Sequence, residues 1–464
     1  CIPIMSDFNF ISLLQTVLSL LGALAVIVIV ILVHELGHFS VARWCGVKIE
    51  RFSLGFGKIL WSRRDKQGTE YAICLLPLGG YVKMLGEGSE AVAPLDRQFA
   101  FNQKSLWARA AIVFAGPLVN FLFAVFLFWL VFQIGVEHIR PVIGEVVPHS
   151  LAAQAGLQAG DEFKQIGRLR AESWQSVLMS LMLHLGDKDP LKVTVQPPRN
   201  QELKSYALNL QAWTIDPNEP QLFQSLGIVP YQPKIPAIVA GVEPKSPAAI
   251  ANLQAGDEII SVNHKPIRDW LDLTQFLQKS PDENILLGVE RHHKIYKIKL
   301  KLSHSELAHG RIMGYLGVRV QAPEWSHSMK QSRHYSWYAA FSPAVQQTME
   351  LFLFNSIVLV KMLSAKLSLH TLGGPISIFT TAGDAFKIGL TAYLSFIAFV
   401  SISLGFVNLL PIPCLDGGYL LFFLIEGLFG KPIPERYQAL LLRLGLLFII
   451  LLMTQAIIND VLRL

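Results

Sequence analysis

The sequence predicts a polytopic α-helical membrane protein with four transmembrane helices and two small α+β domains in tandem outside the membrane. Hydrophobic residues make up 52% of the 464 positions and charged residues only 16%, whereas a soluble domain has about 25% charged residues. Three charge-free apolar runs are each long enough to form a membrane-spanning helix, and a fourth reaches that length when it is extended past one arginine. Between the second and third runs, a 15-residue stretch recurs 96 positions later.

The cysteines and the start of the chain exclude several classes of protein. The four cysteines form no CxxC pair, which argues against a zinc ribbon, a thioredoxin-like motif and a disulfide framework. Residues 1–4 precede Met5 and are interpreted as an expression scar with no part in the fold. The first apolar run, residues 8–33, is too long for a cleaved signal peptide, and His34 and Glu35 follow it where a cleavage site needs small residues.

We expect the transmembrane helices within residues 5–45, 105–136, 386–418 and 436–460. The first three segments contain charge-free runs longer than the roughly 20 residues that a transmembrane helix needs. The fourth run, residues 444–459, is shorter, but it reaches that length when the apolar residues before Arg443 are added. The predicted membrane part is therefore a bundle of four helices.

Basic residues predict the orientation of this bundle. Eleven of them lie between residues 40 and 109, around the connection of the first two helices: Arg43, Lys48, Arg51, Lys58, Arg63, Arg64, Lys66, Lys83, Arg97, Lys104 and Arg109. Basic residues close to membrane-spanning segments stay in the cytoplasm. Residues 46–104 are therefore predicted to be cytoplasmic, and residues 137–385 and both termini to lie outside. This clustering accounts for most of the net charge of +6, so no nucleic-acid partner is expected.

The outer segment contains two copies of one small domain. Residues 148–162 and 244–258 match at eleven of fifteen positions, and Trp174 and Trp270 keep the same offset of 96. This period is too long for a solenoid repeat and fits two tandem domains, which we place at 137–228 and 229–305 with a proline-rich linker at 230–236. The stretch LQAGDEIISVNHKPI in the second copy resembles bacterial PDZ domains, and GDEFKQIGRL in the first is a degenerate version.

The region from 306 to 385 combines apolar and basic residues. Around Phe352 and Met362 it is apolar, with Lys361 and Lys366 close by. Two interpretations are open: an amphipathic helix lying in the membrane interface, or a helix packed under the second PDZ-like domain. The mixture of apolar and basic residues favours the interfacial helix.

Chemistry is suggested first by the HExxH sequence that ends the first apolar run. On a helix, His34 and His38 lie one turn apart on the same face, so both imidazoles can reach one metal ion. Glu35 then lies beside the metal and can act as a general base. The alternative, two polar residues on an ordinary helix surface, is poor here because ionisable groups in a membrane-spanning run are expensive and usually functional.

A catalytic zinc needs a third protein ligand and an open position for water. No HxxGxxH pattern follows His38, and Glu50 lies in a basic loop. Asp416 is the better candidate because Pro411 and Pro413 break the third apolar run just before it, where a carboxylate at membrane depth needs a partner. The alternatives are that Asp416 only caps a helix, or that Cys414 is the ligand.

These motifs together resemble the site-2 protease family of intramembrane zinc metalloproteases. The resemblance rests on HExxH in the first helix, NxxPxPxLDGG from Asn408 onward, and the PDZ-like copies between them. It covers nearly the whole chain from Met5, including LGGPISI at 372–378 and the tail NDVLRL. It implies that His34, His38 and Asp416 bind Zn²⁺ and that Glu35 activates water.

The resemblance also implies residues that support the substrate or the site. Asn408, Pro411 and Pro413 belong to the motif of the third helix, and Gly116 and Asn120 match a GxxxN pattern in the second. Where some relatives have another asparagine five residues before Asn408, this chain has Ser403.

The cytoplasmic region 46–104 resembles the membrane-reentrant β-hairpins of the family. Its segments 52–57, 71–76 and 78–83 carry glycine turns. Gly79, Gly80 and Tyr81 are expected beside the substrate, because a free strand edge close to the metal can pair with an extended peptide. The alternative is an ordinary cytoplasmic hairpin.

The implied function is regulated intramembrane proteolysis in a bacterial inner membrane, as part of an envelope stress response. Substrates would be single-pass membrane proteins, such as an anti-sigma factor already cut on its outer side, or remnant signal peptides. The segment to be cut must first unwind, because a helix hides its carbonyls in hydrogen bonds. The periplasmic PDZ pair would screen substrates by size or bind a trimmed tail.

Two other functions are possible from the sequence. A zinc-free scaffold could use its PDZ-like domains to tether envelope proteins, but intact HExxH and LDGG motifs argue against it. A transporter is suggested by the proline-broken third helix, but the chain shows no inverted repeat.

Overall fold

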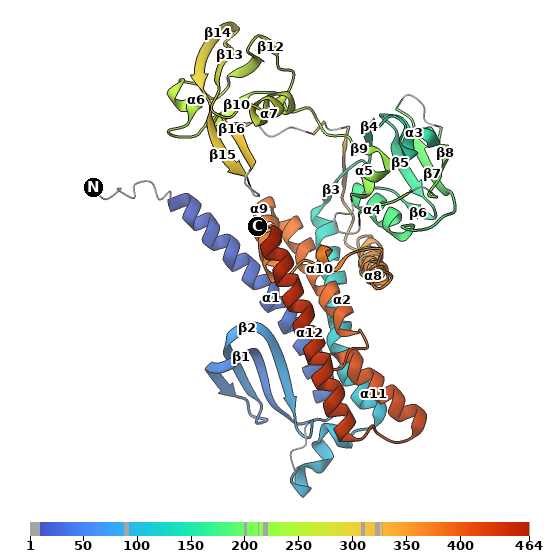
Figure 1. The fold of residues 1–464 in the computed structure, drawn as a ribbon. Helices are drawn as coiled ribbons and strands as arrows, with labels where there is room; N and C mark the ends of the chain where they lie inside the picture. The colour runs from blue at the N-terminus through green and yellow to red at the C-terminus, as the bar shows by residue number, and fades with distance from the viewer. Residues whose placement is uncertain are drawn as a thin grey trace, which may run out of the picture.

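The computed structural model describes residues 10–87, 92–198, 202–211, 213–216, 221–307, 311–320, 325–326 and 328–463. Residues 1–4, the predicted expression scar, lie outside the described residues. The four helices long and apolar enough to cross a membrane are those expected: α1 (Phe10–Trp44), α2 (Leu106–Ile134), α10 (Leu390–Asn408) and α12 (Glu435–Arg463). Figure 1 shows, at one end of these helices, the two domains that the sequence predicts to lie outside the membrane. A β-hairpin lies beside α1 toward the other end.

Helices α1, α2 and α10 form the packed part of the membrane bundle. α2 packs against both of the others, and the contacts are lined by small, fully buried side chains such as Ala23, Ala124 and Ala398. Small residues let helix backbones approach closely where lipid supplies no hydrophobic drive for association. α12 is packed mainly at one end, against α9 (Pro375–Ile388) and the 3₁₀ helix η3 (Leu369–Thr371).

The third predicted span, 386–418, is two helices rather than one. α10 ends at Asn408, and a second helix, α11 (Asp416–Phe429), begins at the predicted ligand. Pro411 and Pro413 have no N–H to continue the helical hydrogen bonds, and Cys414 takes a left-handed φ of 82°. The LDGG motif therefore begins a helix of its own and does not end a membrane span.

Two motifs far apart in the sequence meet at the C-terminal end of α12. Asp460 accepts hydrogen bonds from the backbone N–H groups of Gly374 (2.9 Å) and Ser377 (3.0 Å) and from the Ser377 hydroxyl. Neighbouring Asn459 donates to the carbonyl of Leu369 at 2.7 Å. Because α9 begins with a glycine that has no capping side chain, Asp460 supplies the cap from another helix. The tail NDVLRL thus fastens α12 to the LGGPISI segment.

The region before α2 is a β-hairpin of two long, bent strands, β1 (Ile49–Arg64) and β2 (Glu70–Met84). Phe52 pairs with both Val82 and Tyr71, and Ala72 pairs with both Ser53 and Ser62. Two strands therefore make four strand segments in the order 80–84, 49–54, 70–76 and 59–64. The segment 80–84 forms one edge of this sheet, packed beside α1. Two short 3₁₀ helices, η1 (Pro94–Phe99) and η2 (Phe101–Gln103), lead into α2.

The two sequence copies fold into units with the same sheet order. We call residues 142–230 the first repeat unit and residues 238–320 the second repeat unit. The sheets run β6-β5-β7-β8 and β12-β11-β13-β14, and each unit adds a separate strand pair, β4-β9 or β10-β17. The elements of the first unit are β4 (Ile143–Val146), α3 (Leu151–Ala155), β5 (Glu162–Ile166), β6 (Leu169–Arg170), α4 (Trp174–Leu183), β7 (Leu191–Gln196), β8 (Lys204–Leu208), α5 (Leu222–Leu226) and β9 (Ile228–Pro230).

The second repeat unit runs further along the chain than the expected boundary at 305. Its closing strand β17 pairs with β10, and a hairpin, β15-β16, precedes it. Its elements are β10 (Val239–Val242), α6 (Pro247–Ile250), β11 (Glu258–Val262), β12 (Lys265–Pro266), α7 (Trp270–Gln278), β13 (Asn284–Arg291), β14 (Lys294–Lys301), β15 (Ser303–Leu307), β16 (Arg311–Tyr315) and β17 (Val318–Val320). A further strand pair, β3 (Val136–Ile139) with β18 (Lys330–Arg333), joins the start and end of the outer segment.

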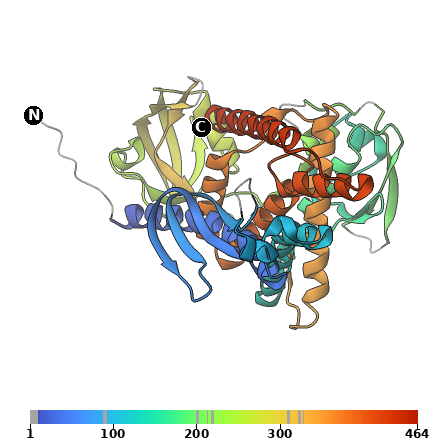
Figure 2. The same ribbon diagram turned by 90° about the horizontal axis from the view of Figure 1, so that it is seen from below.

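Helix α8 (Phe341–Leu363) does not pack under the second repeat unit, which was one of the two interpretations drawn from the sequence. It packs against α2 and α10, with Ala344, Thr348 and Leu351 buried. Its other end packs against the core of the first repeat unit, not the second, through residues that include Ile357 and Met362. One side of α8 is therefore covered by protein and joins the membrane helices to the first repeat unit (Figure 1). The other side exposes Phe341, Val345, Met349, Leu353 and Val360, so a location in the membrane interface stays a prediction. The two repeat units lie on either side of the helix ends (Figure 2).

Candidate metal centre

Three predicted ligands come together at the junction of α1, α2 and α11. The Nε2 atoms of His34 and His38 lie 3.2 Å apart. Asp416 Oδ2 lies 3.3 Å from His34 Nε2 and 3.5 Å from His38 Nε2. Both imidazoles are buried. In the part of the chain that the structure describes, this is the one group of His, Cys, Asp and Glu side chains arranged to hold a metal ion.

These separations fit a zinc ion. Ligand atoms about 2.0–2.1 Å from a tetrahedral zinc lie about 3.3–3.4 Å from one another, as the three atoms do here. Asp416 Oδ2 is also buried without a hydrogen-bond partner among the described residues, although a buried carboxylate oxygen is costly to leave unpaired. Two imidazole nitrogens and an orphaned carboxylate oxygen that converge on one point form a donor set for a cation.

The other ring nitrogens of the histidines are held by α2. His38 Nδ1 lies 2.9 Å from the carbonyl oxygen of Ile112, to which it donates. His34 Nδ1 lies 3.2 Å from the amide nitrogen of Asn120, and Asn120 Oδ1 is buried without a partner among the described residues. Because an amide nitrogen only donates, turning the Asn120 amide over lets Oδ1 accept the proton of His34 Nδ1 and satisfies both groups. A proton held on Nδ1 leaves the Nε2 lone pair free for a metal, which is the usual arrangement around ligating histidines. Asn120, expected as a support residue, lies in that position.

Glycines allow α1 and α2 to approach closely enough for these contacts. A Cβ added at Gly116 would lie 2.3 Å from His38 Nε2 and 2.9 Å from His34 Cε1. A Cβ at Gly37 would lie 2.5 Å from the carbonyl oxygen of Ala115. The imidazoles therefore lie directly against the α2 backbone, and Gly116 has a steric reason to be glycine.

The two glycines of LDGG place Asp416. A Cβ at Gly417 would lie 2.3 Å from the carbonyl oxygens of Leu409 and Leu410, and one at Gly418 would lie 2.4 Å from that of Ile412. The first turn of α11 therefore folds tightly over the proline-broken segment. The rival ligand Cys414 lies in this segment and does not belong to the metal-binding group.

Glu35 is on the same helix as the histidines but outside the ligand group. It is half-buried, and its side chain lies against the edge strand of the hairpin, where a Cβ at Gly80 would lie 2.9 Å from Glu35 Cγ. Gly80 thus leaves space for Glu35 beside the sheet edge.

The other expected substrate residues fall into two groups. The Asn408 amide nitrogen lies 3.4 Å from His34 Nε2, at the ligand cluster itself. Tyr81 lies further along the sheet, with its ring stacked on Phe56 and its hydroxyl accepting a hydrogen bond from Arg51. Gly79 lies against Phe56 as well.

The prolines of the third-helix motif act through the backbone. Pro411 is exposed and Pro413 is half-buried. The Pro413 carbonyl lies against Gly445 of α12, where no side chain could fit. The motif thus shapes the segment that leads to Asp416 and also contacts the last membrane helix.

The structure adds a contact of Ser403 and residues that the sequence did not connect with the site. Ser403 accepts a hydrogen bond from Asn355 on α8 at 3.4 Å, so an amide from another helix meets the position where some relatives carry asparagine. The Ile112 carbonyl acts through the backbone and has no sequence signal. Arg109 and Glu426 form a bidentate ion pair between α2 and α11; their only sequence signal is that each charge lies at the unfavourable end of its helix.

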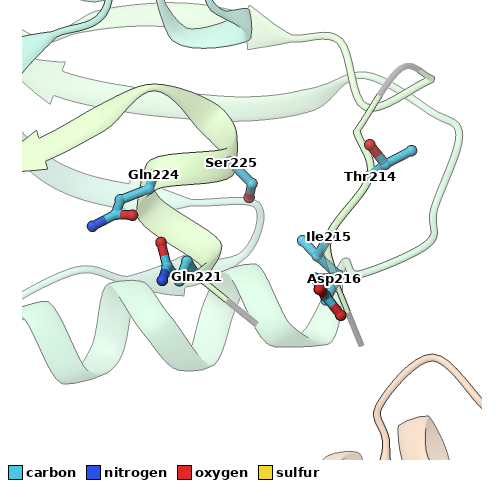
Figure 3. A pocket seen from close by; sticks show the side chains of 6 residues that line it. All are labelled: Thr214, Ile215, Asp216, Gln221, Gln224 and Ser225. Atoms are coloured by element: carbon cyan, nitrogen blue, oxygen red, sulfur yellow. The ribbon is translucent and has the colours of Figure 1, made fainter. Parts of the chain in front are cut away.

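A small polar hollow lies away from these residues. It has a volume of about 290 Å³ and is lined by Thr214, Ile215, Asp216, Gln221, Gln224 and Ser225 in the first repeat unit (Figure 3). None of these residues belongs to the metal-binding group. This hollow is therefore separate from the metal-binding group.

Comparisons with known proteins agree with this geometry. Residues 22–452 match the model of peptidase family M50. The chain is 41% identical to the regulator of sigma-E protease RseP of Escherichia coli, over 98% of this chain and all of that one. It is 40% identical to a putative zinc metalloprotease of Vibrio cholerae, over 94% of this chain and 96% of that one.

Among solved structures, the PDZ domain of an SdrC-like protein from Listeria monocytogenes aligns with 19% of this chain and 90% of its own, at 16% identity and a TM-score of 0.16. A likeness of that size establishes no fold. The match over nearly the full length does establish the family, and the donor set fits its metal. The chain belongs to peptidase family M50 and is a zinc metalloprotease.

Proposed function

We propose that this protease cuts the transmembrane segments of single-pass membrane proteins. The observation that carries the proposal is the place of the ligands: His34 and His38 lie on α1, a helix of membrane-spanning length, next to α2, another. A metal centre built from such helices reaches peptide bonds at membrane depth. The similarity to regulators of sigma-E protease supports an anti-sigma factor, already cut on its outer side, as the substrate class, with remnant signal peptides as further substrates.

The proposed orientation has the repeat units and both chain ends in the periplasm of a bacterial inner membrane. The N-terminal end of α1, the C-terminal end of α12 and both repeat units lie together in Figure 1. The ligands are close to the opposite end of α1, which leads into the basic segment before α2. Since basic segments stay in the cytoplasm, the metal centre would lie nearer the cytoplasmic face.

The hairpin is proposed to enter the membrane and to bind the substrate as an added strand. Its far part exposes large apolar side chains, including Leu60, Trp61, Leu75 and Leu76, which favour lipid over water. Its edge segment, residues 80–84, lies beside Glu35 at Gly80. A substrate segment that pairs with this edge would be extended, with its backbone held by hydrogen bonds.

Each polar group of the site has a role in the proposed catalytic steps. When bound, Zn²⁺ supplies a Lewis acid that polarises the scissile carbonyl and lowers the pKa of water toward 7. Glu35 takes the proton of the attacking water and passes it to the leaving amine. Asn408, with its amide at the ligand cluster, donates a hydrogen bond to the substrate backbone. The Ile112 carbonyl accepts the Nδ1 proton of His38, and the side-chain oxygen of Asn120, once the amide is turned toward His34, accepts that of His34; both rings are then in the tautomer that leaves Nε2 free.

The first experiment tests the base and the ligands separately. Glu35→Gln should keep zinc and lose cleavage of a reporter transmembrane peptide, because loss of a general base costs roughly 100-fold or more. Residual activity above about 1% would contradict the base role. Asp416→Ala should weaken zinc binding by more than about 100-fold, since even outer partners of ligands cost 10–100-fold. Cys414→Ala is the matched control and should keep the metal; the reverse result would replace Asp416 by Cys414.

The second experiment tests the repeat units as a filter. Val239 and Val320 are paired across β10 and β17, so the second repeat unit can be removed and its flanking ends joined over a short distance. The intact enzyme should prefer a substrate whose outer domain has been removed, and the shortened enzyme should cut both forms. If the folded, shortened enzyme keeps the preference, selection does not depend on this unit.

A further inference from the structure

An ion pair clamps α11 to α2. Arg109 Nη2 donates to Glu426 Oε1 at 2.6 Å, and Nη1 donates to Oε2 at 3.2 Å. The guanidinium carbon lies 5.1 Å from the ring centre of Phe423, which is itself buried. Both charged side chains are largely buried, at 15% and 20% exposure. This geometry, two parallel hydrogen bonds and an aromatic face, is the strong form of an arginine–carboxylate contact.

Each charge lies at the end of its own helix where the helix dipole disfavours it. Arg109 lies in the first turn of α2, and Glu426 lies in the last turn of α11, where its carbonyl accepts the capping N–H of Gly430. Helix dipoles favour anions at the N-terminus and cations at the C-terminus. Neither residue therefore stabilises its helix through the helix dipole. Arg109 is also one of the basic residues that predict the orientation, and its contact with Glu426 is a second, structural interaction.

The pair lies one helix-length away from the metal ligand. Asp416 is the first residue of α11, and Glu426 follows ten residues later, about 15 Å along the axis. α11 packs mainly on α2, and a Cβ at Gly427 would lie 3.1 Å from Leu106 Cδ2. The same α2 carries the Ile112 carbonyl and Asn120, which hold His38 and His34.

The histidines and Asp416 thus reach the metal by different elements. His34 and His38 are fixed by α1 against α2, whereas Asp416 follows a proline-broken segment and depends on how α11 lies on α2. A small rotation of α11 would move Asp416 Oδ2 away from the two Nε2 atoms, which now lie 3.3 and 3.5 Å from it.

We propose that Arg109 and Glu426 are positioning residues that hold Asp416 at the distance a zinc ion requires. The proposal rests on Asp416 being a ligand, as proposed above. Neither side chain touches the metal or the substrate. Their effect is to fix the third ligand relative to the first two.

The test measures zinc affinity of the full-length protein in detergent by competition with a chelator. Glu426→Gln keeps the shape of the side chain and removes its charge, and Arg109→Ala removes the guanidinium group that makes both hydrogen bonds. Each should lower zinc affinity about tenfold, the smaller end of the range for outer partners of ligands. Arg109→Lys should recover part of the loss, and the swapped double variant Arg109→Glu/Glu426→Arg should bind more tightly than either single change. Cleavage at saturating zinc should show a lower kcat with an unchanged KM.

The control is Asp96→Ala, which breaks an exposed ion pair with Lys48 and should leave zinc affinity unchanged. Wild-type zinc affinity in folded Glu426→Gln and Arg109→Ala, with Asp416→Ala still losing the metal, would overturn the clamp and leave the ligand assignment standing. Zinc retained by Asp416→Ala would instead overturn the ligand assignment. A swapped variant no better than the single changes would also overturn the clamp.

Discussion

The two repeat units share a fold and differ in what holds them. Both have the same sheet order and begin their first helix with a serine cap, Ser150 or Ser246. The core of the first unit includes Leu367 and side chains of α8, whereas the described core of the second contains only residues of that unit and the adjoining Ala237. The first unit is therefore an extension of the membrane helices, and the second is attached through its connecting segments.

The two units also differ in the charged partner of an equivalent buried aspartate. Asp161 and Asp257 occupy equivalent positions, and each accepts a hydrogen bond of 2.9 Å from a backbone N–H three residues earlier. Arg291 adds a bidentate contact to Asp257, at 2.6 and 2.7 Å. The strand registers place Pro197 where the second unit has Arg291. A repeat that is clear in sequence thus hides two differences, one in attachment and one in charge pairing.

The largest expected effect comes from the attachment of the first unit. Leu367→Ala should lower the free energy of unfolding of that unit by about 3 kcal/mol, because it leaves a cavity in a packed core. Leu367 is only 4% exposed. Hydrogen exchange of the full-length protein in detergent, resolved by segment, should show lost protection in the first unit and in α8.

The matched control is Leu363→Ala at the end of α8, where the side chain is 80% exposed; it should leave exchange unchanged. The second unit should keep its protection in both variants. Equal loss of protection in the two units would mean that they unfold together and that the contrast in attachment has no energetic meaning.

A smaller effect is expected from the charge pairing. Arg291→Ala should destabilise the second unit by on the order of 2 kcal/mol, since it leaves a buried carboxylate without its charged partner. Asp257 is fully buried. Lys294→Ala, an exposed change in the next strand, is the control. An unchanged unfolding temperature of the second unit in Arg291→Ala would show that water replaces the arginine.

The sequence was sufficient to predict the four spans and the repeat, because each has a strong local signal. Charge-free runs and an exact 96-residue offset need no knowledge of distant contacts. The partner of α8 could not be predicted, since an apolar helix face does not specify what covers it. The second unit was predicted too short because its last strand, Val318–Val320, follows a hairpin with no counterpart in the first copy.

The candidate site shows the same division. His34 and His38 were predicted together by helical spacing, and Asp416 by the cost of a carboxylate at a broken helix. Ile112 contributes only a carbonyl oxygen, which any residue carries. Arg109 and Glu426 are 317 residues apart, so only the fold brings them together.

The smallest expected effect concerns pH: as the pH falls, the two aspartates should change the stability of their units in opposite directions. Burial raises the pKa of Asp161, with only a backbone N–H and the distant charge of Lys204 to oppose it. Burial also opposes ionisation of Asp257, but the hydrogen bonds from the Arg291 guanidinium and the N–H of Gln254 outweigh it. They hold the pKa of Asp257 below its usual range. A carboxyl with a lowered pKa stabilises the fold above its unfolded pKa of about 3.9 and loses this contribution as the pH falls through the folded value.

A carboxyl with a raised pKa does the opposite: its contribution is present below the unfolded pKa and is lost as the pH rises through the folded value. Between neutral pH and about pH 3, the aspartate contribution should therefore weaken the second unit and strengthen the first, relative to variants in which each aspartate is replaced by asparagine. Asp161→Asn should accordingly stabilise the first unit at pH 7 and lose that advantage in acid, while Asp257→Asn should destabilise the second unit at pH 7 and matter less in acid. Segment-resolved hydrogen exchange, corrected for the intrinsic pH dependence of exchange, measures both units in one sample. If the two substitutions changed stability in the same direction at pH 7, the arginine would not be what separates the two aspartates, and the contrast between the units would reduce to their attachment.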